Sequence, residues 1–245
     1  MKLLGAEELL DAWEAGLNQP PLQRALILLT AALPGTSAEM VGAMTLGERD
    51  RRLLRLREDL FGQRLDNMAE CPDCGERVEW ENRTQDFLAA AEPPAPATES
   101  FELQTGGCTL HFRLPTSLDI MAVIDEGGGN NAELTLLSRC VLEARQAERP
   151  CDFDDIPQEA LQALGSRLGA LDPLADLRME LSCPACDHEW VVAFDIAGFL
   201  CEEIDHWAGR MLRTVSELAA AFGWSEREIL QISPLRRQLY LGMIG

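Results

Sequence analysis

The sequence predicts an α+β fold that is mostly helical, with a small β unit that is interrupted by a large insertion and flanked by helical segments on both sides. Apolar residues recur every three to four positions over residues 1–70 and 197–245, which is the period of amphipathic helices. Short alternating segments occur between these two regions, as half-buried strands require. Two Cys-x-x-Cys pairs, about a hundred residues apart, each precede such a segment.

Helix signals are dense at the start of the chain. Residues 6–17 carry leucine and tryptophan at helical spacing, which predicts an amphipathic helix. Thr45 and Glu48 form a capping box, the arrangement that begins many helices. The arginine-rich segment that follows, residues 48–58, is interpreted either as a docking surface or as a solvated helix face with i,i+4 ion pairs.

The middle of the chain mixes strand and helix signals. The Pro/Ala-rich segment at residues 92–100 predicts a linker and a subdomain boundary. The elements expected around it are a strand over residues 77–82, a hairpin over 101–114, helices over 116–124, 132–147 and 157–171, and strands over 177–181 and 189–194.

The last quarter of the chain returns to helix signals. A long helix is expected over residues 196–222, and a short amphipathic helix begins at Ser233-Pro234. Such a helix is suited to binding in a partner's groove, and its alternative is to pack back on its own bundle. The candidate partner-binding residues of this helix are Leu235, Arg236, Arg237, Leu239 and Tyr240.

The two cysteine pairs have the spacing of metal-binding turns. They lie in the segments Cys71-Pro72-Asp73-Cys74-Gly75 and Cys183-Pro184-Ala185-Cys186-Asp187. Glycine or aspartate after the second cysteine accommodates a positive φ. Four thiolates form a closed tetrahedral shell around zinc, so we expect one structural Zn²⁺ on Cys71, Cys74, Cys183 and Cys186. The alternatives are two unrelated turns or redox pairs; a redox motif precedes a helix, whereas strands are expected here.

This zinc-ribbon-like pairing sets the expected organisation. The four parts are an N-terminal helical region (1–70), a split zinc-ribbon unit (71–92 and 177–196), an inserted hairpin with helices (93–176) and a C-terminal helical region (197–245). The ends of the insertion must lie close together if both cysteine pairs bind one ion.

The charge balance limits the possible partners. Lys and Arg total 21 against 41 Asp and Glu, a net charge of −20, which disfavours binding to nucleic acid or to anionic membranes. No small-molecule substrate is expected. Glu7 and Glu8 interrupt any apolar leader, so we expect a cytoplasmic protein whose cysteines stay reduced.

Motifs typical of catalysis are missing from the sequence. It contains no HExxH helix, GxSxG elbow or P-loop, and a closed four-cysteine shell leaves no position for a substrate. We therefore expect no enzymatic activity. Four further cysteines are expected to be buried or inert, because free cysteine behaves as a small apolar residue: Cys108, Cys140, Cys151 and Cys201.

Ten short segments in order resemble one known family, the T4-family baseplate hub assembly chaperone, which also occurs in bacterial contractile injection systems. These segments are Trp13–Leu17, Gly47–Asp50, Leu53–Gly62, Cys71–Gly75, Phe112–Ser117, Asp172–Asp176, Cys183–Cys186, Phe194–Ile196, Phe222–Ser225 and Arg236–Tyr240. Asp187 departs from the family pattern, which commonly has glycine there.

The resemblance implies a non-catalytic chaperone that helps hub, spike or wedge proteins of a contractile tail-like particle to assemble. It also implies that the two cysteine motifs are metal ligands. Three alternatives remain open from the residues: a structural baseplate subunit retained in the particle, a zinc-ribbon interaction adaptor for nucleic acid or transcription proteins, and a metalloenzyme.

Overall fold

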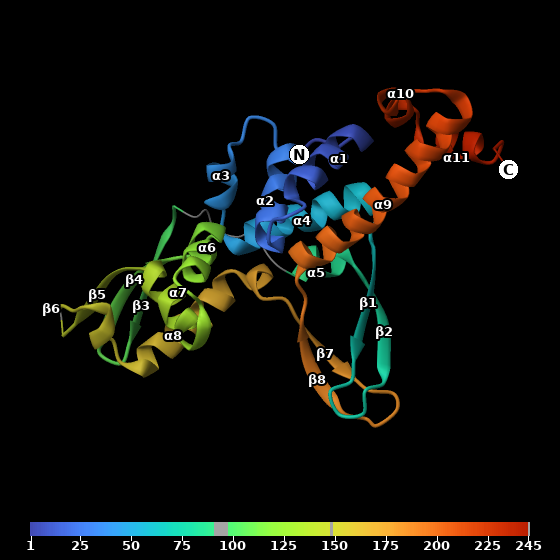
Figure 1. Cartoon of the computed structure of the whole chain (residues 1–245). Coiled ribbons are helices and arrows are strands. Elements are labelled where there is room, and N and C mark those ends of the chain that lie inside the picture. The colour runs from blue at the N-terminus through green and yellow to red at the C-terminus, as the bar shows by residue number, and fades with distance from the viewer. Residues whose placement is uncertain (91–97, 148, 245) are drawn as a thin grey trace. The chain divides into compact units, whose positions relative to one another are not determined.

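The computed structural model is mostly helical, with small antiparallel sheets (Figure 1). It describes residues 1–90, 98–147 and 149–244. The α+β class expected from the sequence is therefore confirmed. The linker expected at residues 92–100 lies largely outside the described residues.

The chain divides into two compact units. The helical unit comprises Met1–Ala38 together with Ile196–Gly245, and the cysteine unit comprises Glu39–Asp195. The cysteine unit is thus inserted in the sequence of the helical unit. The four-part organisation expected from the sequence stays a prediction.

The helical unit is a bundle of helices around α9. Its elements are α1 (Ala6–Gly16), α2 (Pro21–Ala32), α9 (Ile196–Phe222), α10 (Glu226–Gln231) and α11 (Pro234–Leu241). Helix α9 contacts the other four, and its predicted bounds are confirmed. Ser225 and Ser233 cap α10 and α11 by accepting backbone N–H groups, as their sequence positions indicate.

One carboxylate joins three helices of this unit. Asp205 of α9 accepts a hydrogen bond from Trp13 Nε1 at 2.8 Å and two from the guanidinium of Arg24, one of them at 3.0 Å. The apolar core of the helical unit is formed by buried aliphatic residues. These include Leu9, Ala25, Leu29, Leu200, Ile204 and Ala208.

The cysteine unit combines helices with hairpins. Its elements are α3 (Ala38–Gly42, starting one residue before the unit), α4 (Leu46–Phe61), β1 (Arg64–Glu70), β2 (Arg77–Arg83), α5 (Thr84–Ala90), β3 (Ser100–Thr105), β4 (Cys108–Arg113), α6 (Ser117–Asp125), η1 (Gly129–Asn131), α7 (Ala132–Cys140), β5 (Val141–Gln146), β6 (Arg149–Pro150), η2 (Phe153–Asp155), α8 (Gln158–Leu171), η3 (Pro173–Ala175), β7 (Arg178–Ser182) and β8 (Glu189–Ala193).

A four-stranded antiparallel sheet of order β3-β4-β5-β6 lies in the insertion. Alternate residues of β4, Cys108, Leu110 and Phe112, are buried, because successive side chains of a strand point to opposite faces. They form one core with Leu164 and Leu168 of α8. The hairpin and the helix expected in this region are confirmed.

The helix expected over residues 132–147 is wrong in its second half. Helix α7 ends at Cys140, and the next six residues form β5, which pairs with β4. Ala144 lies opposite Leu110 and is buried. The backbone of this segment finds hydrogen-bond partners along β4, and such tertiary pairing overrides local helix propensity.

Three of the five arginines of α4 differ from both interpretations of the sequence. Arg52 does pair with Glu48 at i,i+4, but Arg49, Arg51 and Arg57 are only 9%, 6% and 4% exposed. Arg49 forms two hydrogen bonds to the Asp50 carboxylate, at 2.6 and 3.0 Å. A buried guanidinium requires such partners, so these residues are internal rather than solvated or docking groups.

A polar junction joins α4 to the insertion. The Gly47 N–H donates to the Asp172 carboxylate at 2.9 Å, and a Cβ at Gly47 would lie 1.7 Å from that carboxylate. Thr45 and Thr116 form an isolated antiparallel β-bridge, and the Leu46 N–H donates to the Pro115 carbonyl at 3.1 Å. These contacts bring together three of the segments on which the family resemblance rests.

Membrane-spanning helices were sought over the same described residues. None of the helices there combines the length and the apolar character that crossing a bilayer requires.

Candidate metal centre

Two hairpins of the cysteine unit carry the predicted ligands at their tips. Strands β1 and β2 pair from Arg64↔Arg83 to Glu70↔Arg77, and β7 and β8 pair from Arg178↔Ala193 to Ser182↔Glu189. Each hairpin ends in a turn that contains one Cys-x-x-Cys pair. Figure 1 shows the two tips side by side, although a long stretch of sequence separates them.

Both turns have the same backbone hydrogen bonds. In the first, the Cys71 N–H donates to the Glu76 carbonyl at 2.8 Å, and the Gly75 N–H donates to the Cys71 carbonyl at 2.9 Å. In the second, Cys183 replaces Cys71 in both bonds, and each distance is 2.9 Å. The two turns are therefore structural repeats.

The residue after each cysteine pair has a positive φ. It is +75° at Gly75 and +57° at Asp187, a region that glycine enters freely and aspartate tolerates. Asp187 thus adopts the conformation for which the family commonly uses glycine. The departure in sequence leaves the turn geometry unchanged.

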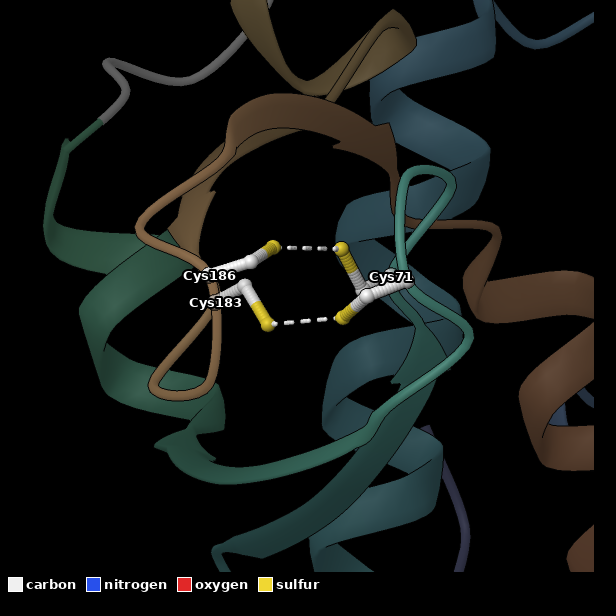
Figure 2. Close-up of side chains that lie close together, drawn as sticks. Cys71, Cys183 and Cys186 are labelled. Carbon is white, nitrogen blue, oxygen red and sulfur yellow. Dashed lines mark hydrogen bonds between the residues drawn. The ribbon is translucent and has the colours of Figure 1, made fainter.

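The four sulfur atoms form a compact cluster (Figure 2). The Sγ atoms of Cys71 and Cys186 are 3.7 Å apart, those of Cys74 and Cys183 are 3.6 Å apart, and all four lie within 4.8 Å of one another. Four sulfurs placed tetrahedrally at zinc–sulfur bonds of about 2.3 Å lie roughly 3.8 Å from each other. The spacing therefore fits a tetrahedral four-thiolate metal site.

The close approach of the four thiols shifts their pKa values in opposite directions. Burial alone raises the pKa of Cys71, but backbone N–H groups of Cys74 and Asp73 donate to its sulfur and lower this pKa to about 7. The N–H of His188 acts in the same direction on Cys186, yet burial and the neighbouring thiols raise its pKa to about 12. Thiolates this close repel one another, and a divalent ion removes that repulsion.

Burial of two of the cysteines and aromatic packing between the hairpins stabilise the position of the cluster. Cys71 and Cys183 are 2% and 0% exposed, whereas Cys74 is exposed. Farther from the tips, Phe87 of α5 stacks on Phe194, which follows β8, with ring centroids 5.1 Å apart. The two hairpins are thus held at their bases by aromatic packing and at their tips by the sulfur cluster.

The remaining cysteines do not join the cluster. Cys108, Cys140 and Cys201 are buried, and Cys151 is half-buried. Burial raises the pKa of Cys140 to about 11, which keeps it protonated and unreactive at neutral pH.

The residues predicted to bind a partner lie in two environments on α11. Leu235 and Leu239 are 71% and 57% exposed, and Arg236 is also exposed. Arg237 is buried and donates to the Leu230 carbonyl at 3.1 Å, and Tyr240 packs edge-on against Trp224. Helix α11 therefore packs on its own bundle with one face and exposes the other.

Sequence comparison identifies the family. Residues 18–201 match the family model described as T4 bacteriophage base plate protein. The chain belongs to this family. The matched part of this base plate protein contains both cysteine pairs, α4 and the insertion, and it ends within α9. No curated protein and no solved structure matches the chain.

Sequence reasoning missed two features near the site. Strand β1 was not expected, although its mixed sequence ends directly before Cys71. The buried arginines of α4 were not expected either. The resemblance of Gly47–Asp50 to the family was a signal for Arg49, and no local pattern indicated that Arg51 and Arg57 are buried.

Proposed function

We propose that this base plate protein is a non-catalytic assembly chaperone for the hub of a contractile tail-like particle, and that it works in the cytoplasm. Beyond family membership, we propose a structural zinc ion, a transient role, the absence of catalysis and a cytoplasmic location. Its clients are proposed to be hub, spike or wedge proteins.

The proposed metal is structural Zn²⁺ held by Cys71, Cys74, Cys183 and Cys186. Four thiolates in a tetrahedral arrangement favour zinc, and the sulfur spacing supports this choice. All four coordination positions come from the protein, which leaves none for a substrate or for an activated water. The ion therefore supplies folding energy rather than chemistry.

The exposed face of α11 is the observation that carries the chaperone role. Leu235 and Leu239 of α11 are 71% and 57% exposed, and Met243, in the turn that follows the helix, is 69% exposed. Contiguous exposed apolar residues mark interaction sites in soluble proteins. Because Arg237 and Tyr240 fix the opposite face on the bundle, the helix is presented in an ordered form.

Composition of the assembled particle tests the transient role. Particles are purified from cells that express the whole gene cluster, and this chain is quantified against hub and tube proteins by mass spectrometry. A chaperone is recovered with hub components from lysate and is missing from finished particles. Retention in a fixed ratio to the hub would instead establish the second candidate, a structural baseplate subunit.

A paired substitution separates the docking face from folding. Leu239→Glu places a charge on the exposed face and is expected to abolish recovery of hub proteins. Glu217→Arg changes an exposed residue of α9 and serves as the control. Equal recovery with both variants would exclude α11 as the docking face.

A further inference from the structure

A groove in the helical unit is separate from both the sulfur cluster and the exposed face of α11. It is formed by α1, α9 and α10 and has a volume of about 470 Å³. Its apolar lining residues are Leu10, Trp13, Leu212 and Leu230. All of them lie outside the residues matched by the family model.

The floor of the groove is apolar and fixed in place. Leu10 and Leu230 are buried, and Leu212 is 41% exposed along one side. The Trp13 ring is held by the 2.8 Å hydrogen bond from its Nε1 to Asp205. Because these side chains of the floor are ordered before a partner binds, the entropy cost of association is lower.

The rim of the groove is acidic. Four lining residues are carboxylates against one arginine, Arg227. Glu7, Asp11 and Glu14 are spaced i, i+4 and i+7, so they form one ridge along α1. Within residues 1–90, 98–147 and 149–244, no ion pair neutralises Glu7, Asp11, Glu14 or Glu226.

We propose that this groove binds an amphipathic helix of a partner protein, with leucine-type side chains on the floor and arginine or lysine side chains along the acidic ridge. The ridge is about 10 Å long, at 1.5 Å per residue, and matches basic residues spaced i, i+4 and i+7 on the partner. Charge complementarity of this kind guides association and selects the partner. The site does not depend on the zinc ion or on the chaperone role.

Two synthetic peptides of about 16 residues, long enough to form helix, probe the groove. Both carry leucines at i, i+4 and i+8, but one has arginines and the other has glutamates on the adjoining face. Fluorescence anisotropy of each labelled peptide is measured with the full chain at low and at high salt. The arginine peptide should bind, more weakly as salt rises, and the glutamate peptide should not bind.

Charge reversal then locates the site. The Asp11→Arg/Glu14→Arg variant should weaken binding of the arginine peptide about tenfold. Glu202→Arg/Glu217→Arg, which changes exposed residues outside the groove by the same charge, should leave the affinity unchanged. Leu212→Gln should weaken binding without changing the charge.

Three results would overturn the proposal. They are equal binding of the two peptides, equal loss of affinity in the groove variant and its control, and concentration-dependent self-association that the groove variant alone abolishes. The last result would assign the groove to a second copy of this chain.

Discussion

In the helical unit, α1, α2 and α9 bury aliphatic side chains against one another, the partly exposed Asp205 carboxylate accepts hydrogen bonds from Trp13 and Arg24, and Arg237 is a buried cation. The cysteine unit buries arginine and aspartate side chains and gathers four thiols at the tips of two hairpins. The cysteine unit thus buries more charged side chains than the helical unit, and each buried charge needs a matched partner. Its stability should therefore depend more on single residues.

The largest expected effect is on the metal. Cys183→Ser removes a buried ligand, and because zinc binding of this kind is coupled to folding by on the order of 10 kcal/mol, the hairpins should separate. Elemental analysis should find about one zinc per wild-type chain and none in the variant, since four ligands form one tetrahedral site. Hydrogen exchange should rise most in the cysteine unit and much less in the helical unit, which loses only the loop-closure contribution of the inserted segment.

Cys151→Ser is the matched control for that experiment, because Cys151 lies outside the sulfur cluster. It should retain the metal. A natively purified wild-type chain that contains no zinc would contradict the metal assignment. Uniform exchange in both units of Cys183→Ser would contradict the proposed difference between them.

The next effect is at the polar junction. Gly47→Ala would place a Cβ 1.7 Å from Asp172, and overpacking of this kind costs about 3 kcal/mol. The free energy of unfolding, measured by urea titration, should fall by that amount. The neighbouring backbone of α4 must shift or the Gly47–Asp172 hydrogen bond must break.

Gly169→Ala controls for the gain in helix propensity. Gly169 lies in α8 with no atom near the position of an added Cβ, so alanine should stabilise the chain by about 0.5–1 kcal/mol. The junction would be excluded as a tight contact if both glycine variants were stabilised.

The smallest effect is expected in the helical unit. Asp205→Asn weakens the bonds from Arg24 and Trp13 and should cost about 1 kcal/mol, since Asp205 is partly exposed and charged hydrogen bonds are screened there. Burial raises the pKa of Asp205, but the bonds from Arg24 and Trp13 outweigh it and hold that pKa below the ordinary 3.8.

The sign of this pKa shift defines a pH test. A carboxyl with a lowered folded-state pKa contributes its full stability above its unfolded pKa of about 3.9 and loses it as the pH falls through the folded value. The difference between wild type and Asp205→Asn should therefore be complete at neutral pH and should vanish in strong acid. A difference that persists there would indicate lost packing instead of a lost ion pair.

Local signals predicted much of the fold. The period of residues 196–222 and the caps at Thr45 and Ser225 gave correct helix positions, because both depend on neighbours in sequence. The cysteine turns were recognisable for the same reason. We predicted that the two turns lie together because a tetrahedral zinc site needs four ligands and each turn supplies two. The sulfur–sulfur distances of 3.6 and 3.7 Å confirm that the turns are close.

Features decided by distant partners were not predicted. Residues 141–146 form a strand because β4 offers them hydrogen bonds, and Arg49 and Arg57 are buried although their sequence suggests a surface. Local patterns carry no information about which distant segment covers a residue. For the same reason the sequence did not decide whether α11 binds a partner or packs on its own bundle. In the structure one face of this helix is packed on the bundle and the other face is exposed.

The place of the cysteine unit within the sequence has a consequence for synthesis of the chain. On the ribosome, α1 and α2 emerge first, but their partner α9 follows only after the whole cysteine unit has been made. Closing the helical unit across an unfolded segment of that length carries an entropic penalty, and a cysteine unit already closed by metal shortens the gap. Folding of the cysteine unit is thus expected to favour completion of the bundle, and the proposed zinc ion would influence the helical unit by this route.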